Sequence, residues 1–392
     1  MRWRRQQQTL SSVLFYLAFA TLILSVIATF DVIRGNRSIP NLKDIAPTPP
    51  AMPRVSVIVP ARNEEGKIEE ALRSLLAQDY PYLEIVVVND RSTDRTGAIL
   101  ESLRESQPRL RLVDLQELPT GWLGKNYALF IGSEQATGAL LLFTDADIVM
   151  DSTTVSRAVA FLLDHRLDHL TLAPQVIMPS ISLDLFVGGF SVFLSLFARP
   201  WKAKDPQSSA HIGIGAFNLV RAEVYRAVGT HQAIAMRPDD DLKLGKLIKK
   251  HGYRQDIVAG RGLVQVRWYA SFGEMIDGLM KNAFSALEYS VLAVILSSAA
   301  QLVLSVWPFV AVFVTSGWTR ILNLVIVLVI FWLCWEAARF TGARRWFGAA
   351  FPLATLLFVY IIWRSMLVTL ATGGITWRGT HYPLSALRAN KV

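Results

Sequence analysis

Two aspartates separated by one residue are the first candidates for chemistry in this chain. Asp145 and Asp147 come just after the apolar residues 139–142, a run that is typical of a buried strand. Side chains two positions apart in a strand point to the same side, so both carboxylates can approach one cation. Carboxylate oxygens suit Mg²⁺ or Mn²⁺. The pattern therefore predicts a divalent-cation and diphosphate site, although an isolated D-x-D is more often a solvated turn.

Two earlier apolar runs also end in polar side chains. Residues 54–60 are followed shortly by Glu64, and residues 83–88 are followed by Asn89 and Asp90. Ligands of open α/β sheets bind beyond the carboxyl ends of the strands. We therefore expect Glu64, Asp90 and the later aspartate pair to line one crevice. For Asp90 alone, a role in a turn or a helix cap is an equal alternative.

Five motifs together carry a resemblance to a known family. They are V-S-V-I-V-P-A-R-N-E-E from residue 55, V-V-V-N-D-R-S-T-D from 86, G-W-L-G-K-N-Y-A-L from 121, F-T-D-A-D from 143 and P-D-D-D-L-K-L-G from 238. Over about residues 54–285 the chain resembles membrane-attached family 2 glycosyltransferases with a GT-A fold. Among these it is similar to bacterial enzymes that glycosylate hopanoids and carotenoids and, more distantly, to ceramide glucosyltransferases. The resemblance implies transfer of a sugar from a nucleotide-sugar donor, a UDP-sugar, to a lipid.

The resemblance also implies which residues bind the donor. Those of the nucleotide pocket would be Pro60, Arg62, Asn63, Glu64 and Asp90, the last at the uracil or ribose. Lys125 is a cation in a glycine-containing turn and suits ribose or phosphate, although without the surrounding motifs it would be an ordinary surface lysine. Asp147, together with Asp145, would bind the Mg²⁺ or Mn²⁺ that bridges the diphosphate.

The general base is expected in the segment 238–245. Asp241 matches the catalytic carboxylate of the family, and Asp240 matches the acidic residue before it. Asp241 would take the proton from the acceptor hydroxyl while that oxygen attacks the anomeric carbon, and one such displacement inverts the configuration. Taken alone, three successive carboxylates before a helix equally suit amino-terminal capping.

A further segment bears on the number of sugars that are transferred. Gln265-Val266-Arg267-Trp268 resembles the Q-x-x-R-W element of the family but is one residue short. Arg267 would face the diphosphate and Trp268 the acceptor. Processive polysaccharide synthases carry the full element, so the departure favours transfer of a single sugar. A processive synthase and a non-catalytic, nucleotide-binding membrane scaffold are the alternatives.

An alternation of strands and helices must position these residues. Strands are predicted at 54–60, 83–89, 109–115, 139–144 and 169–176, and helices near 64–77, 93–106, 124–137 and 152–164. Such alternation is typical of an α/β fold with a parallel sheet. The resemblance implies that this α/β domain, over residues 54–270, is a GT-A (Rossmann-like) nucleotide-sugar domain.

Apolar segments flank this domain and raise the hydrophobic content of the chain to 52%. Residues 10–30 carry no charge and are long enough to cross a bilayer. The predicted parts outside the catalytic domain are an amino-terminal anchor (1–31), a Pro-rich linker (32–53), an interfacial amphipathic helix (271–288), three transmembrane helices (289–371) and a polar tail (372–392). The apolar stripe of residues 272–284 suits either an interfacial helix or packing in the core.

Charge and compartment complete the expectations. The net charge of +9 is dispersed along the chain, so anionic headgroups and a diphosphate are expected as partners rather than nucleic acid. Because nucleotide sugars are cytosolic, we expect a multi-pass protein of the inner (plasma) membrane with its catalytic domain in the cytosol. One span before the domain and three after it would then place the tail from residue 377 on the outer side.

Overall fold

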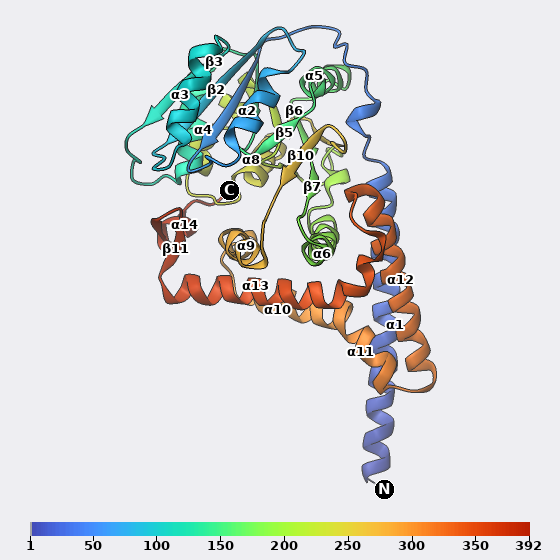
Figure 1. Cartoon of the computed structure of the whole chain (residues 1–392). Coiled ribbons are helices and arrows are strands. Elements are labelled where there is room, and N and C mark those ends of the chain that lie inside the picture. Colours follow the sequence, from blue (N-terminus) through green and yellow to red (C-terminus); the bar gives the residue numbers. More distant parts are fainter. Residues whose placement is uncertain (1) are drawn as a thin grey trace. The chain divides into compact units, whose positions relative to one another are not determined.

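The computed structural model describes residues 2–392 and divides the chain into two compact units (Figure 1). The helical unit comprises Met1–Ser38, Met178–Arg199 and Ser271–Val368. The sheet unit comprises Ile39–Ile177, Pro200–Ala270 and Thr369–Val392. The domain predicted over residues 54–270 therefore differs from the sheet unit in three respects: residues 39–53 of the predicted linker belong to the sheet unit, residues 178–199 belong to the helical unit, and residues 369–392 join the sheet unit.

The sheet unit is built on seven strands in the order β3-β2-β1-β4-β8-β6-β9. They are β1 (Val55–Ala61), β2 (Leu83–Asp90), β3 (Leu110–Leu115), β4 (Leu140–Phe143), β6 (His169–Ala173), β8 (Asn218–Arg221) and β9 (Gln255–Ala259). The first four strands of the sheet run parallel, but β8 is antiparallel to both β4 and β6. The predicted α/β class is confirmed. The prediction of a parallel sheet is wrong at β8, which runs antiparallel to its neighbours.

Helices cover both faces of this sheet, which explains the continuous apolar strands. Val57 and Val59 of β1 pack with α2 (Ile68–Leu76), α3 (Thr96–Ser106) and α5 (Thr154–Asp164). Ile58, on the opposite face, belongs to the cluster of α4 (Gly124–Glu134), α7 (Ala222–Ala227) and α8 (Asp240–Lys250). Since successive side chains point to opposite faces, a strand covered on both sides must be apolar throughout.

A second, three-stranded sheet lies next to the aspartate pair. It contains β5 (Ile148–Met150), β7 (Gln175–Ile177) and β10 (Val264–Arg267). β10 runs antiparallel to β5 and parallel to β7. The predicted strand 169–176 is therefore two strands, β6 and β7, divided at Pro174, which has no N–H to donate to a continuous ladder. Because β5 begins directly after Asp147, this sheet fixes one end of the turn that carries both aspartates.

The ends of the sheet unit are tied to it by hydrogen bonds. Of the linker, Leu42 is fully buried in the core, and Ala259 N–H donates to the Pro40 carbonyl at 2.9 Å. The predicted polar tail forms the hairpin β11 (Gly374–Trp377) and β12 (Thr380–Pro383), followed by α14 (Leu384–Ala389). Asn390 accepts from Met236 N–H and donates to the Ala233 carbonyl, both at 2.9 Å. Short 3-10 turns lie at Leu42–Asp44, Pro200–Lys202 and His231–Ile234.

The helical unit contains most of the apolar length of the chain. Its helices are α1 (Arg2–Arg37), α6 (Ile181–Ala198), α9 (Phe272–Ala286), α10 (Val291–Gln301), α11 (Trp307–Val314), α12 (Gly317–Thr341) and α13 (Phe351–Ala371), with a π-helical segment at Leu302–Val306 and a 3-10 segment at Arg345–Ala350. α1 and α12 lie side by side, joined by Phe30 against Trp332 and by the Arg37–Glu336 ion pair of 2.7 Å (Figure 1).

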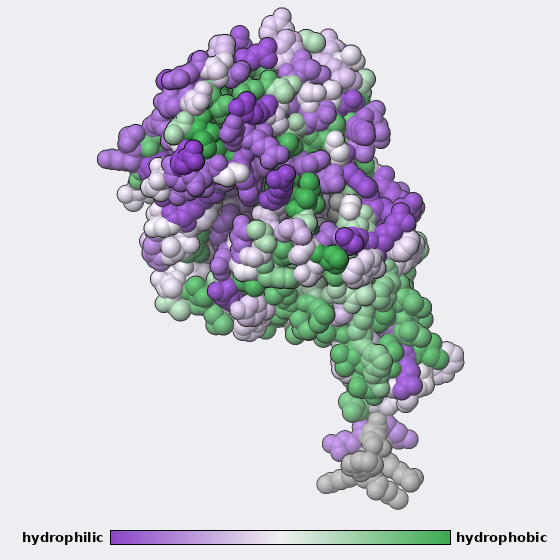
Figure 2. All heavy atoms as spheres, in the orientation of Figure 1, coloured by the Kyte–Doolittle hydropathy of each residue, from purple (hydrophilic) through white to green (hydrophobic). Residues whose placement is uncertain are grey.

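Five helical segments of the described residues are long and apolar enough to cross a membrane. They are Gln8–Arg37, Ile181–Lys202, Val291–Val314, Gly317–Phe340 and Arg345–Thr372. Figure 2 shows hydrophobic side chains gathered on the visible face of these helices, whereas the visible face of the sheet unit is mostly hydrophilic. Four of the segments correspond to the predicted spans, and Ile181–Lys202 is additional.

The stripe predicted on residues 272–284 lies on α9 and is largely buried. Met275, Leu279 and Phe284 are 0%, 8% and 1% exposed. Phe284 N–H donates to Ser365 Oγ of α13 at 3.3 Å, so one end of α9 packs on α13. Of the two alternatives for this stripe, burial favours packing over contact with lipid.

One close backbone approach positions the start of α8. A Cβ added at Gly245 would collide with the carbonyl of Ile212, and one added at Gly213 would collide with the carbonyl of Asp241. Residues 241 and 245 are one helical turn apart, so this face of α8 lies against the backbone of residues 212–213. Only glycine allows the contact at both positions.

We predict that Gly245→Ala lowers the melting temperature of the full-length protein in detergent. The added methyl meets backbone rather than a movable side chain, and overpacking of this kind costs about 1–3 kcal/mol. The matched control is Gly97→Ala in α3, where the nearest atom to the added Cβ is Asn89 Nδ2 at an ordinary 3.4 Å. Equal melting temperatures for the two variants would contradict the prediction.

Candidate active site

The two aspartates lie in a turn rather than in a strand. β4 ends at Phe143, and β5 begins at Ile148. The turn is held from the other side by Asp145 N–H, which donates to the Gly215 carbonyl at 3.0 Å, and by Thr144 Oγ1, which donates to the Ala216 carbonyl at 2.7 Å. The expected alternation of a strand therefore does not apply here, and hydrogen bonds to residues 215–216 set the direction of Asp145.

Electrostatics nevertheless couple the two carboxylates. Burial raises the pKa of Asp147, and the charge of Asp145 raises it further, against the opposing effect of Lys67. Lys67 Nζ lies 3.1 Å from Asp147 Oδ2 and donates to the Arg267 carbonyl at 3.2 Å. Among residues 2–392, no group of three or more His, Cys, Asp or Glu side chains is arranged to hold a metal. A cation at this turn would therefore have two protein carboxylates and need further oxygen ligands.

Lys125, the second residue of α4, links this turn to the start of α8. Its Nζ lies 2.9 Å from Asp145 Oδ1 and 3.4 Å from Asp240 Oδ1. Burial alone would lower the pKa of Lys125, but the carboxylates of Asp145, Asp240 and Asp241 together raise it well above its ordinary value. The described partners of Lys125 are thus carboxylates, and its expected contact with a ribose or phosphate stays a prediction.

The three aspartates at 239–241 have three different surroundings. Asp239 is buried and accepts hydrogen bonds from the buried Arg237 at 3.1 and 3.2 Å, with Lys243 Nζ 3.6 Å away. Asp240 is buried beside Lys125. Asp239 occupies the N-cap position of α8, but its side chain makes no capping hydrogen bond. The capping alternative is therefore not the arrangement seen.

Asp241 is the most accessible of the three. Its Oδ2 accepts from Gly215 N–H and its Oδ1 from Leu242 N–H, both at 2.7 Å. Burial raises the pKa of Asp241 and Asp145 adds to the increase, against Lys125 and the two N–H groups. A carboxylate with a raised pKa is a stronger base, and a partly accessible one can be reached by a substrate.

A small cavity of about 10 Å³ joins these groups. Its lining residues are Lys125, Leu129, Phe143, Thr144, Asp145, Gly215, Asn218, His231, Asp240 and Asp241. Burial lowers the pKa of His231 to about 3, so its ring is neutral and contributes no charge. A cavity of this size is close to the space that one water molecule needs. Asp145, Asp240 and Asp241 therefore line the same cavity.

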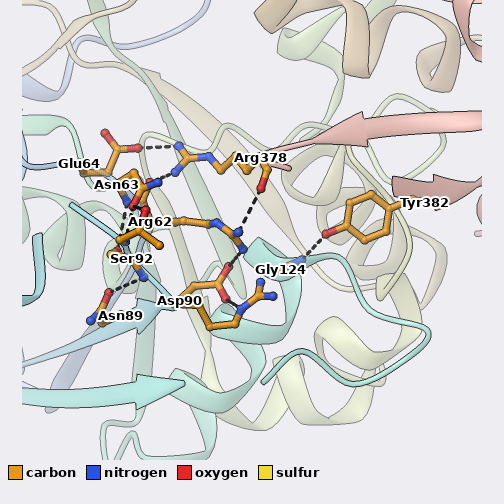
Figure 3. Close-up of polar contacts among 11 residues, drawn as sticks. Arg62, Asn63, Glu64, Asn89, Asp90, Ser92, Gly124, Arg378 and Tyr382 are labelled. Carbon is orange, nitrogen blue, oxygen red and sulfur yellow. Dashed lines mark hydrogen bonds and ion pairs between the residues drawn. The ribbon is translucent and has the colours of Figure 1, made fainter. Parts of the chain in front are cut away.

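The predicted nucleotide pocket gathers around Asp90 at the end of β2 (Figure 3). Asp90 is buried, with Arg91 Nε at 2.7 Å from Oδ1 and Arg62 Nη1 at 3.6 Å from Oδ2. Arg62 Nε and Arg91 Nη2 are buried without a hydrogen-bond partner. Buried donors of this kind normally have an acceptor, so these two N–H groups fit a site that takes a polar ligand.

Three neighbouring residues form the rest of this wall. Pro60 lies near the end of β1, opposite Val88. Asn63 has a left-handed φ of 54° and accepts from Thr93 N–H at 2.8 Å through its side-chain oxygen. Glu64 N–H donates to Thr96 Oγ1 at 2.8 Å, and the Glu64 carboxylate pairs with Arg378 at 2.6 Å. The structure thus brings all of the predicted pocket residues together at two adjacent strand ends.

Arg267 and Trp268 have partners within the protein, and their expected roles toward the diphosphate and the acceptor stay predictions. The Arg267 guanidinium is mostly exposed and lies 3.7 Å from Glu70. The Arg267 carbonyl accepts a hydrogen bond from Lys67 Nζ, which also pairs with Asp147. The Trp268 ring stacks on Tyr269 with centroids 4.9 Å apart. Neither side chain has a described contact with the aspartates.

Sequence reasoning missed three cations of the site, namely Lys67, Arg91 and Arg378. Arg91 lies within a recognised motif and Lys67 follows another, but nothing in their spacing indicates a carboxylate partner. For Arg378 a signal did exist, because residues 374–383 are rich in β-branched and aromatic types around Arg-Gly, which is typical of a hairpin with a two-residue turn.

Comparison with known proteins identifies this arrangement. Residues 56–229 match the family model described as Glycosyl transferase family 2. Over this segment, a little under half of its length, the chain is similar to family 2 glycosyltransferases. A similar solved structure is the mannosyltransferase PcManGT from Pyrobaculum calidifontis in complex with GDP-Man and Mn²⁺, with a TM-score of 0.54 and 23% identity over 91% of this chain and 98% of that one. The α/β fold is accordingly of the GT-A type, as predicted.

Curated proteins are similar to this chain over part of its length. The 4,4'-diaponeurosporenoate glycosyltransferase of Staphylococcus haemolyticus (strain JCSC1435) is 25% identical over 233 residues, 58% of this chain and 60% of that protein. The poly(ribitol-phosphate) beta-N-acetylglucosaminyltransferase TarS of Staphylococcus aureus (strain Mu50 / ATCC 700699) is 38% identical over 123 residues, 31% of this chain and 21% of that protein. The alignment thus spans about three fifths of the first relative and about one fifth of the second.

We predict that Lys125→Met lowers the free energy of unfolding by about 3 kcal/mol, because it leaves partly buried carboxylates without their cation. The loss should be larger at pH 8 than at pH 5, since protonation of the carboxylates at lower pH relieves their repulsion. Thermal unfolding at both pH values measures this. The control is Lys250→Met at the exposed end of α8, where a change within about 0.5 kcal/mol is expected. A loss independent of pH would contradict the electrostatic explanation.

Proposed function

We propose that this glycosyltransferase transfers a single sugar from a UDP-sugar to the hydroxyl of a membrane lipid, with inversion at the anomeric carbon. One observation carries the proposal. Lys125 connects the turn of Asp145 and Asp147 to the start of α8, so an oxygen-rich cation site and the accessible carboxylate of Asp241 belong to one site. A reaction that stabilises a leaving diphosphate and removes a proton needs both.

The donor nucleotide would bind along the ends of β1 and β2. Asp90 would hold the uracil or the ribose, because it is buried, charged and held in place by two arginines. The buried N–H groups of Arg62 and Arg91 that lack acceptors support a polar ligand at this wall. From there the donor would extend toward Lys67 and Asp147.

Asp145 and Asp147 would hold Mg²⁺ or Mn²⁺ at the diphosphate. Both offer carboxylate oxygens, which these ions prefer, and their mutual repulsion favours a shared cation. When bound, such an ion acts as a Lewis acid that stabilises the departing nucleoside diphosphate. Lys67 and Lys125 place two further positive charges beside the same carboxylates.

Asp241 would act as the general base. Its carboxylate is aligned by the Gly215 and Leu242 N–H groups, and its raised pKa gives it basicity. It would take the proton from the acceptor hydroxyl as that oxygen attacks the anomeric carbon from the face opposite the diphosphate. A single displacement of this kind gives the inverted product.

A lipid acceptor is supported by the apolar helices and by one relative. Five segments of the described chain are long and apolar enough to cross a membrane. The relative from Staphylococcus haemolyticus is named as a glycosyltransferase of a carotenoid, 4,4'-diaponeurosporenoate. We propose the inner membrane as the location, with the active site on the cytosolic face, where nucleotide sugars are found.

The carboxyl-terminal hairpin restricts how the helices cross that membrane. The membership of β11, β12 and α14 in the sheet unit supports a topology in which the chain leaves and returns on the same side of the membrane. We therefore propose an even number of crossings between Ser271 and Val368, in place of the three spans and outer tail expected from the sequence. In Figure 1, α13 runs across the direction of α1 and α12. We propose that α13 lies in the interface and does not cross.

The proposed cation site predicts the behaviour of Asp147→Ala. Mn²⁺ should raise the UDP affinity of the wild type, and loss of one of the two carboxylates should remove this increase. In the presence of Mn²⁺ the variant should therefore bind UDP about 10- to 100-fold more weakly than the wild type, the usual scale for damage to a metal site. Calorimetric titration of the full chain in detergent, with and without Mn²⁺, measures it. Asp164→Ala, at the exposed end of α5, is the control and should bind as wild type does. Unchanged Mn²⁺ dependence in a folded Asp147→Ala protein would remove Asp147 from the site.

The proposed base predicts the behaviour of Asp241→Asn, which keeps the shape but not the basicity. Transfer of sugar from UDP-sugar to a lipid extract should fall by about 10² to 10⁴, while UDP binding stays near wild type. In the wild type, activity should be lost as pH falls through a pKa above the ordinary value of about 3.9, because the base must be unprotonated.

Mass spectrometry of the lipid products separates the alternatives. One added sugar per lipid supports single transfer, a ladder of sugars indicates a processive synthase, and nucleotide binding without any product indicates a scaffold. If Asp240→Asn abolishes transfer and Asp241→Asn does not, the base has been assigned to the wrong neighbour.

A further inference from the structure

The tip of the carboxyl-terminal hairpin carries an arginine in an unfavourable conformation. Trp377 pairs with Thr380, so Arg378 and Gly379 form a two-residue turn, with φ of 48° and 80°. Asn and Gly are preferred where both φ values are positive, because a larger side chain is strained there. Strained residues are retained where the side chain has a function. Asn63 and Arg91, also left-handed at φ of 54° and 55°, belong to the same cluster.

Arg378 makes reciprocal contacts with the nucleotide pocket (Figure 3). Its Nη2 donates to Glu64 Oε1 at 2.6 Å, and its Nη1 donates to the Arg62 carbonyl. In return, Arg62 Nη2 donates to the Arg378 carbonyl at 3.0 Å. A second attachment lies at the other end of β12, where Tyr382 Oη accepts from Gly124 N–H at 3.3 Å. The hairpin is therefore fixed both at the end of β1 and beside Lys125.

These contacts place Arg378 between the two ends of the proposed donor site. On one side, Arg62 also pairs with Asp90, the proposed nucleoside contact. On the other side, the Glu64 carbonyl accepts from Lys67 N–H at 3.0 Å, and Lys67 Nζ pairs with Asp147. A nucleotide that extends from Asp90 to the Asp147 turn must pass the Glu64–Arg378 pair.

We propose that Arg378 is a donor-binding residue that contacts the diphosphate, so that the carboxyl-terminal hairpin completes the nucleotide site. The two contacts to Glu64 and the Arg62 carbonyl use two of the five guanidinium N–H groups. The side chain is 41% exposed, which leaves its free edge open to a ligand. A guanidinium already oriented by a carboxylate and a carbonyl is prepared for bidentate binding of phosphate. This inference rests on the proposed function.

Nucleotide titrations of Arg378 variants test it. The full-length protein in detergent with Mn²⁺ is titrated with UDP and, separately, with uridine, for the wild type, Arg378→Gln and Arg378→Lys. We expect Arg378→Gln to bind UDP about 10- to 100-fold more weakly, the scale of one charge-assisted hydrogen-bonded pair, and uridine as the wild type does. Arg378→Lys should recover part of the UDP affinity, since it keeps the charge but not the fork. Arg388→Gln, exposed on α14, is the control for charge and should not change either affinity.

The other outcomes are separable. An equal loss of UDP and uridine affinity would overturn the diphosphate assignment and make the hairpin a structural brace of the pocket. Unchanged or tighter UDP binding by Arg378→Gln would also overturn it, the latter because Arg378 would then compete with the nucleotide for Glu64. If the wild type binds UDP in each case, the proposed function stands while this inference fails. Absence of nucleotide binding to the wild type would overturn both.

Discussion

The ion pairs of the partly buried Lys125 ammonium are the interaction on which the site depends. Asp145, Asp240 and Asp241 come from two segments about a hundred residues apart in sequence, and without a cation their charges would oppose being buried together. Lys125 comes from the first turn of α4, which packs against β1 and β2, so its position is set by the core of the sheet unit. The fold thus supplies the charge that allows the carboxylates to converge.

Close packing at two glycines provides the second constraint. α8 approaches residues 212–213 so closely that the carbonyls of Asp241 and Ile212 leave no space for a Cβ at Gly213 or Gly245. The same approach brings Gly215 N–H to the Asp241 carboxylate. The orientation of the proposed base is therefore a consequence of backbone contact, and it does not depend on a flexible side chain. Asp239, paired with Arg237 inside the protein, anchors the same helix end.

The sequence predicts the local elements well because each has its own signal. The apolar runs 54–60, 83–89 and 139–144 correspond to β1, β2 and β4, whereas the expectation that their polar ends line one crevice stays a prediction. What the sequence could not predict is set by contacts between distant segments. The antiparallel direction of β8, the lysine partners of Asp145 and Asp147, and the outward direction of Arg267 all depend on tertiary packing, which single-sequence patterns do not contain.

The contacts of the carboxyl-terminal hairpin were also beyond prediction from sequence, because they join segments that lie very far apart in the chain. Arg62 and Arg378 are separated by 316 positions, yet each donates to the carbonyl of the other. Between them the chain forms the long apolar helices of the helical unit, whose composition predicts a membrane but gives no indication that the chain returns to the sheet unit. Because Arg378 lies in a segment that follows these helices, the proposed donor site combines residues from both ends of the sheet unit's sequence.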